Sequence, residues 1–139
     1  MLLFTALLLA QTAPCAVMDV NLPTPLAAWT RPALLVKRGE SGAAFAAGQP
    51  VSLGAMTGGD IVFTVAKPGT WGIALDQKGW IELFPAAEGS EALASVSHAH
   101  GPECSTIAKI VRYDLKPGTY RVDFTRMPNP TAKTMLVAP

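Results

Sequence analysis

From Val51 onward the chain consists of short runs in which apolar and polar residues alternate. The clearest runs are residues 60–65, 70–76 and 119–125, where every second side chain is large and apolar. A period of two places successive side chains on opposite faces, so each run predicts a strand with one buried face. Twelve glycines and twelve prolines supply the turns between them. About eight or nine short strands at this spacing predict an all-β fold, an antiparallel β-sandwich or jelly roll.

The expected domain covers residues 33–139 and follows a proline-rich lead-in at 17–32. We expect the lead-in to be extended, with Leu22, Leu26 and Trp29 packed against the domain, because its prolines cannot donate to a strand ladder. The segment 91–98 is the weakest of the predicted strands. The full expected set is 33–37, 51–55, 60–65, 70–76, 80–84, 91–98, 107–115, 119–125 and 131–138.

The first residues have the pattern of an export signal. Met1 to Ala10 is an apolar run, and small and polar residues follow it. The run is too short for a bilayer, which needs about 20 apolar residues. We therefore expect residues 1–16 to be a signal peptide. Its cleavage site stays open, because cleavage after Ala13 would put Gln11 at the minus-three position and cleavage after Ala16 would put Pro14 there. The alternative is a misassigned start or a first buried strand.

This leader predicts a bacterial periplasmic or secreted protein, with no stable membrane insertion after its removal. The net charge of +1, from 11 basic and 10 acidic side chains, comes without any block of like charge. A nucleic-acid partner is therefore not expected. The sequence also lacks a Gly-x-Ser-x-Gly elbow and a phosphate-binding loop. The expected partner is a protein or small molecule whose identity the sequence does not give.

The segment 97–105, Ser-His-Ala-His-Gly-Pro-Glu-Cys-Ser, holds both histidines of the chain. On a strand, His98 and His100 would point to the same face and could hold one metal ion. Cys104 or Glu103 would be the third ligand. Imidazole and thiolate ligands together suit zinc or copper. The competing interpretation is a solvated pair of histidines that binds nothing.

Cys104 has a second possible role. In an oxidising compartment the two cysteines of a chain usually pair, so Cys15 and Cys104 are expected to form a disulfide. The bridge would close a loop of about 90 residues and contribute about 4 kcal/mol on the chain-entropy model. Two alternatives stay open, a thiolate metal ligand and a free or acylated cysteine.

The strand at 80–84 offers a weaker candidate. Trp80 and Phe84 share one face of it, and Ile81 and Leu83 share the other. One face must be partly exposed. An exposed Trp80–Phe84 pair would stack on a sugar or a protein partner, whereas a buried pair would pack between the sheets, the use that we expect.

The pattern Lys-Pro-Gly-Thr-aromatic occurs at 67–71 and again at 116–120. Proline followed by glycine predicts a type II turn, after which the aromatic residue enters the core. We interpret the repeats as two equivalent corners of a sandwich. With the strands around them, they resemble the bacterial pre-peptidase C-terminal type of domain, over the second half or more of the chain. That resemblance implies a β-sandwich that is a non-catalytic module of secreted enzymes, implicated in binding or export.

A narrower resemblance rests on Trp29, the His-x-His-Gly-Pro-x-Cys-Ser segment and the second corner. These features are similar to short exported proteins of sphingomonad-type bacteria, some of which carry a homogentisate 1,2-dioxygenase label. Enzymes of that name are much larger cytosolic proteins with a His/His/Glu iron site, so the label would imply iron. Three hypotheses follow: a non-enzymatic binding or accessory protein with a metal at His98 and His100, a small metal-dependent oxygenase, or a structural, partner-binding module.

Overall fold

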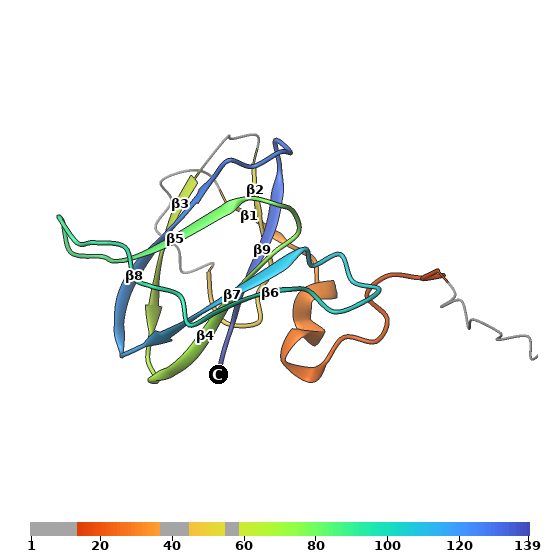
Figure 1. The fold of residues 1–139 in the computed structure, drawn as a ribbon, viewed down its shortest axis with the longest axis horizontal. Coiled ribbons are helices and arrows are strands. Elements are labelled where there is room, and N and C mark those ends of the chain that lie inside the picture. The colour runs from red at the N-terminus through yellow and green to blue at the C-terminus, as the bar shows by residue number, and fades with distance from the viewer. Residues whose placement is uncertain (1–13, 37–44, 55–58) are drawn as a thin grey trace, which may run out of the picture.

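The computed structural model describes residues 14–36, 45–54 and 59–139. Within these ranges the chain forms nine strands and one short 3-10 helix. The strands lie in two sheets that face each other (Figure 1). The predicted β-sandwich is therefore confirmed. The apolar run of the expected signal peptide, at residues 1–10, lies outside the described residues.

The larger sheet has six strands in the order β1-β2-β9-β4-β7-β6, and the smaller has three in the order β3-β8-β5. The pairs are antiparallel except β1 with β2, which are parallel. This parallel pair lies at one edge of the larger sheet, whose other strand pairs are antiparallel. The strands are β1 Leu34–Val36, β2 Val51–Leu53, β3 Gly59–Val65, β4 Gly69–Leu75, β5 Trp80–Pro85, β6 Ser97–His100, β7 Lys109–Leu115, β8 Gly118–Thr125 and β9 Ala132–Val137.

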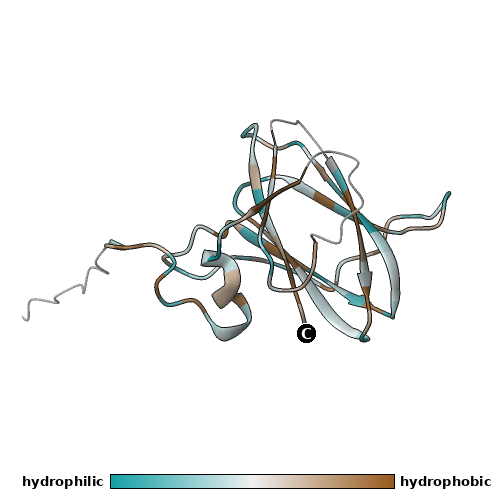
Figure 2. Ribbon diagram, turned by 180° about the vertical axis from the view of Figure 1, so that it is seen from behind, coloured by the Kyte–Doolittle hydropathy of each residue, from teal (hydrophilic) through white to brown (hydrophobic). Residues whose placement is uncertain are grey.

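The main core lies between the two sheets. It contains the inward-facing residues that the alternation predicted, such as Ile61 and Phe63 of β3 and Val122 and Phe124 of β8, each at most 2% exposed. Figure 2 shows these apolar segments along the strands. Period-two patterning was therefore sufficient to assign the buried face of these strands.

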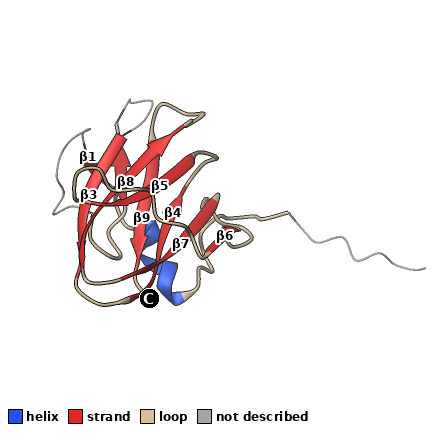
Figure 3. Cartoon of the chain, turned by 60° about the vertical axis from the view of Figure 1, so that its left-hand side comes forward, coloured by secondary structure: helices blue, strands red, loops and turns tan. Residues whose placement is uncertain are grey.

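A second, smaller core lies on the other face of the six-stranded sheet, beneath helix η1 (Thr24–Thr30). Figure 3 shows this helix against β4, β7 and β9. Leu26 and Trp29 of η1 are buried there. A 3-10 turn superimposes residues three apart, so both side chains face the sheet. The predicted packing of these two residues is confirmed.

The predicted extended conformation of the lead-in is wrong over η1. Pro25 lies in the first turn of the helix, where its missing N–H is tolerated. The helix ends at Thr30, and the next residue, Arg31, is extended with φ −66° and ψ 155°. Pro32 follows and disfavours helical geometry in the residue before it. Two prolines thus set the bounds of the helix instead of preventing it.

Strand β4 is covered on both faces and is buried from Trp71 to Leu75. Its small residues face η1, where space is limited. A Cβ on Gly72 would lie 3.2 Å from Ile110 Cγ2 and 3.3 Å from Val137 Cβ. Only small side chains fit on this face of β4, because the neighbouring strands close over it.

The two Lys-Pro-Gly-Thr corners lie side by side and carry the chain from one sheet to the other. Val65 at the end of β3 pairs with Gly118, and Leu115 at the end of β7 pairs with Gly69. The interpretation of the repeats as equivalent sandwich corners is confirmed. The predicted type II turn is wrong, since the two glycines have φ of +151° and +157° where a type II turn needs roughly +80°. A crossing between sheets requires a more open bend than a hairpin.

Each corner is fastened by its aromatic residue. Trp71 Nε1 donates to the carbonyl of Lys67 at 3.0 Å, and Tyr120 Oη donates to the carbonyl of Lys116 at 2.7 Å. The spacing of four residues is the same in both. This arrangement resembles the tyrosine corner of other sandwiches, in which a buried hydroxyl bonds the backbone a few residues upstream.

Strand β6 is displaced from its predicted position at 91–98 to Ser97–His100. The preceding segment crosses from the smaller sheet to the larger one and cannot pair as a strand along its length. Within it, the N–H of Leu93 instead donates to the carbonyl of Leu83 in β5 at 2.8 Å. The result is a short edge strand whose four residues are all exposed.

Candidate functional site

Strand β6 presents the two histidines on one face, as predicted. His98 lies opposite Val111 and His100 lies opposite Lys109 in the antiparallel register with β7. Opposite residues share a face of the sheet, and Val111 belongs to the core between the sheets. Both imidazoles therefore project from the inner face of the larger sheet, at its edge.

The strand ends at His100, and the chain turns at Gly101. A Cβ at this position would lie 2.0 Å from the carbonyl oxygen of Ile107. No other residue type fits without displacing the backbone, so the turn after His100 requires glycine.

The loop that follows is bridged to the N-terminal arm by the predicted disulfide. Cys15 and Cys104 are bonded, with 5.4 Å between their Cα atoms. Cys104 has a left-handed φ of 57°, and its carbonyl accepts a hydrogen bond from the N–H of Asp19 at 2.8 Å. A disulfide sulfur is not a thiolate, so the structure removes Cys104 from the proposed metal ligands.

Polar contacts reinforce the bridge. The carboxylate of Asp19 accepts two hydrogen bonds from Thr106, one from the backbone N–H at 2.7 Å and one from Oγ1 at 2.5 Å. Thr106 Oγ1 also accepts a hydrogen bond from Nε1 of the buried Trp29 at 2.9 Å. Sequence reasoning missed Asp19 and Thr106, because no spacing rule links residues so distant in the chain.

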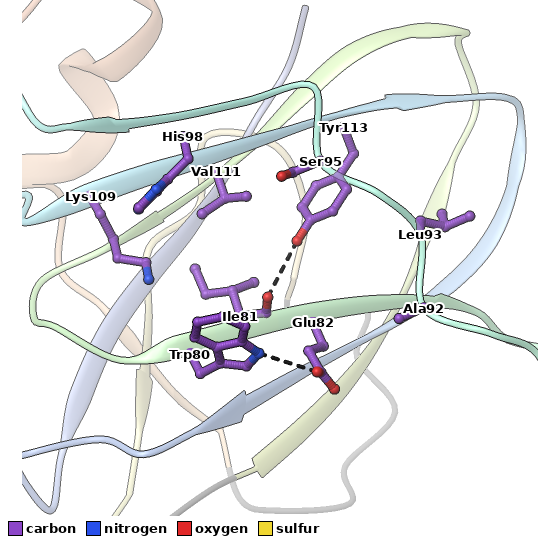
Figure 4. Close-up of a pocket in the computed structure, with 10 residues that line it drawn as sticks. All are labelled: Trp80, Ile81, Glu82, Ala92, Leu93, Ser95, His98, Lys109, Val111 and Tyr113. Atoms are coloured by element: carbon purple, nitrogen blue, oxygen red, sulfur yellow. Dashed lines mark hydrogen bonds between the residues drawn. The ribbon is translucent and has the colours of Figure 1, made fainter.

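A groove of about 260 Å³ lies between β5 on one side and the β6–β7 edge on the other (Figure 4). Figure 4 shows His98 and Lys109 approaching it from one side and Trp80 and Glu82 from the other. The groove joins residues from three strands and from the crossing segment before β6. The side chains with polar or aromatic groups in its lining are Trp80, Glu82, Ser95, His98, Lys109 and Tyr113.

The free edge of β5 forms one wall of the groove, and its carbonyls are occupied. Lys109 Nζ donates to the carbonyl of Gly79. Tyr113 Oη donates to that of Ile81 at 3.4 Å. The carbonyl of Leu83 already accepts from Leu93. These bonds tie the two sheets together where no strand of the larger sheet pairs with β5.

Burial changes the acid–base properties of two groups in the groove. Desolvation lowers the pKa of Lys109. Burial, and next the negative charge of Glu82, raise the pKa of Tyr113 to about 12. The phenol of Tyr113 therefore stays protonated at neutral pH and acts as a donor.

Trp80 is the exposed aromatic residue of the groove, with 52% of its surface accessible. Its Nε1 donates to Glu82 Oε1 at 3.1 Å. The guanidinium of Arg126 lies over its ring, 5.6 Å from the centroid. With the indole N–H occupied, the ring offers an apolar surface of fixed orientation.

Phe84 lies on the same outer face of β5, under the guanidinium of Arg121 at 4.8 Å. The expected use of Trp80 and Phe84 in packing between the sheets is wrong, because Ile81 and Leu83 fill the core instead. Binding of a sugar or a protein partner by this pair stays a prediction.

The metal site also stays a prediction. Within residues 14–36, 45–54 and 59–139, no three His, Cys, Asp or Glu side chains are placed to share a metal ion. Glu103 is exposed on the loop. His98 lines the groove, and His100 lies outside its lining. In the same described ranges no helix has the length and apolar character to cross a membrane.

No protein-family model matches the chain, and no curated protein matches it. Among solved structures it is similar to the pre-peptidase C-terminal domain of a collagenase from Bacillus anthracis. The identity is 13% and the TM-score 0.44, over 76% of this chain and 97% of that domain. The resemblance through the His-x-His segment stays a prediction.

Proposed function

We propose that this chain is an exported binding or accessory module, and that the groove between β5 and the β6–β7 edge is its ligand site. One observation carries the proposal. An exposed Trp80 converges with the charged and polar side chains of Glu82, His98 and Lys109 on one hollow. Apolar surface with a few convergent polar groups is the usual composition of a ligand site.

The rigidity of the walls supports this proposal. Lys109 holds the carbonyl of Gly79, just before β5, and Tyr113 holds the carbonyl of Ile81 in β5, so the backbone on both sides is fixed before a ligand arrives. Glu82 and Arg126 orient the indole of Trp80 in the same way. A preformed site loses less conformational entropy when it binds.

Binding is favoured over catalysis by what the groove contains. Ser95 and His98 both line it, but no hydrogen bond joins them in the described part of the chain. An activated nucleophile needs a base within hydrogen-bond reach. An iron oxygenase needs three convergent ligands, and the described residues bring together two histidines.

Export is supported by two features. The apolar run at residues 1–10 has the pattern of a signal peptide. The Cys15–Cys104 disulfide, which requires that cleavage occur before Cys15, is stable in an oxidising compartment. Fusing residues 1–16 to alkaline phosphatase, which folds only outside the bacterial cytoplasm, tests the leader. We expect phosphatase activity in the fusion and none when Leu7 and Leu8 are replaced by arginine. Equal activity in the two fusions would contradict export by this segment.

The groove itself is tested by a screen of small molecules that differ in charge and shape. The indole signals of the three tryptophans are the readout in a ¹H–¹⁵N spectrum, because Trp29 and Trp71 are buried and Trp80 is exposed. We expect the compounds that bind to shift the Trp80 signal and leave the other two in place. Ligand-induced shifts that are scattered over the surface would disprove the groove as the ligand site. So would shifts of the β6 backbone signals that are as large in Trp80→Ala as in the wild type.

A second candidate function is transition-metal binding by His98 and His100. The register that places both imidazoles on one face of an exposed strand favours it. Titration with Cu²⁺ and with Zn²⁺ provides the test, and we expect binding that His100→Ala weakens. Equal affinity of the wild type and the His98→Ala/His100→Ala variant would disprove this candidate. Because His100 lies outside the groove lining, His100→Ala separates metal binding from ligand binding in the groove.

A further inference from the structure

We infer that the groove binds an uncharged carbohydrate, one sugar ring of which stacks on Trp80. This inference rests on the proposed function and adds the class of ligand. It follows from the charges that line the groove, from the state of the β5 edge, and from the exposed indole.

The charges of the groove disfavour ligands of a single sign. Glu82 supplies a carboxylate and Lys109 an ammonium group to the same hollow. An anionic ligand would lose water beside the carboxylate of Glu82, and a cationic ligand would lose water beside the ammonium group of Lys109. In both cases the ligand would be desolvated next to a like charge. A neutral ligand that carries both donors and acceptors avoids this cost. Sugar hydroxyls have both properties and match a carboxylate, an imidazole and an ammonium group equally well.

A zwitterion such as a free amino acid is the principal rival. It would place its two charges against Glu82 and Lys109. Ion pairs at an exposed site contribute only about 0–1 kcal/mol, and both groups already have internal partners, the indole of Trp80 and the carbonyl of Gly79. An open groove therefore contributes little to the binding of a zwitterion, and such a ligand would leave the exposed part of the Trp80 ring without a partner.

A peptide strand is disfavoured by the edge of β5. Adding a strand to a sheet requires free carbonyls and N–H groups along the edge. The carbonyls of Gly79, Ile81 and Leu83 are already occupied by Lys109, Tyr113 and Leu93. An extended peptide would have to break these bonds to pair with β5.

The indole of Trp80 is the positive feature for a sugar. It is half exposed at the mouth of the groove and held in place by Glu82 and Arg126. The C–H face of a pyranose is apolar and flat, so it can stack on such a ring while its hydroxyls reach the polar side chains. A volume of about 260 Å³ is smaller than typical drug-sized pockets, which begin at about 300 Å³. It therefore suits one sugar ring, with the chain continuing along the surface.

The test compares soluble probes by their effect on the Trp80 indole signal of the full, disulfide-bonded protein. The neutral probes are cello-, laminari- and malto-hexaose. The charged probes are oligogalacturonate, fully deacetylated chitosan oligomer and free glycine. We expect at least one neutral hexasaccharide to bind, and Trp80→Ala to weaken it about tenfold or more, which corresponds to about 1.4 kcal/mol. Trp80→Phe should retain part of the affinity, and His100→Ala on the same edge should retain all of it.

Each outcome decides the inference. Binding of a charged probe or glycine in place of the neutral sugars, with the same dependence on Trp80, would overturn the ligand class and leave the groove as a ligand site. A sugar that binds equally to wild type and Trp80→Ala lies elsewhere and also overturns the inference. If none of the probes binds, the carbohydrate inference fails, and the small-molecule screen above decides separately whether the groove is a site.

Discussion

Two neighbouring parts of the β6–β7 hairpin use polar side chains in opposite ways. At the loop 101–108, which we call the pinned loop, Thr106 binds Asp19 and Trp29 of the N-terminal arm. Alongside, in the groove, His98 and the ring of Trp80 face an open hollow. The pinned loop satisfies its polar groups within the chain, whereas the groove leaves polar and apolar surface available to another molecule.

This difference predicts that the two regions respond differently to mutation. A hydrogen-bonded, buried residue contributes to folding, and its loss leaves partners unsatisfied. An exposed residue at a binding surface contributes little to folding. Substitutions at the pinned loop should therefore change stability, and those at the groove should change binding.

The largest effect is expected from Trp29→Ala. The side chain is fully buried between η1 and the larger sheet and donates to Thr106, so its removal leaves a cavity and removes one of the two hydrogen bonds of the Thr106 hydroxyl. We expect a loss of about 4 kcal/mol in the free energy of unfolding, measured by urea denaturation. Trp29→Phe, which keeps an aromatic ring and loses the hydrogen bond, should lose less than half of that. Similar losses in both variants would show that the hydrogen bond, and not the packing, dominates.

The disulfide comes second. Replacing Cys15 and Cys104 by serine releases a chain segment with a sequence separation of 89 residues. We expect the free energy of unfolding to fall by about 3 kcal/mol, less than the chain-entropy value because the reduced unfolded chain keeps some structure. The groove should be unaffected, and the Trp80 indole signal is the readout for this. A displaced Trp80 signal in the folded double variant would contradict the independence of the two regions.

Tyr113 is the exception in the groove, because it is buried and hydrogen-bonded and therefore contributes to stability. Its pKa is raised from 10.0 to about 12, so the folded state retains the phenol proton more strongly than the unfolded state does. This contribution is complete below pH 10 and is lost as the pH rises through about 12. We expect the free energy of unfolding, measured by urea denaturation, to fall over this pH range more steeply in the wild type than in Tyr113→Phe. Parallel declines would mean that Tyr113 is not desolvated as described.

The smallest effect on stability is expected from Trp80→Ala. Half of the indole is exposed and its neighbours on β5 lie in the core without it. The free energy of unfolding should change by less than about 0.5 kcal/mol, while ligand binding in the groove weakens about tenfold or more. A destabilisation comparable to that of Trp29→Ala would assign Trp80 to the fold and remove the contrast between the two regions.

The sequence was most informative where the physics is local. Alternation identified the inward residues of β3 and β8, such as Phe63 and Val122, because a strand can bury only one of two faces. The disulfide followed from the presence of two cysteines and the expectation of an oxidising compartment. The shared face of His98 and His100 followed from their spacing on a strand, which the register with β7 confirms.

The rest depends on contacts between distant parts of the chain. Sequence reasoning did not find the groove, since Trp80, His98 and Tyr113 come from three strands in two sheets. It also missed η1, because prolines read as breakers when their place in a helix is unknown. The pairing of Asp19 with Thr106 spans 87 residues, and no periodicity reports such a contact.

The occupied carbonyls of β5 have a consequence for how the protein behaves at high concentration. The edge strand of an open sheet can recruit the edge of another molecule and start aggregation. Along β5, the side chains of Lys109 and Tyr113 and the backbone of Leu93 already bond the edge. The same three bonds that shape the groove thus protect this side of the smaller sheet from self-association, and removing the donors by Lys109→Met with Tyr113→Phe exposes it.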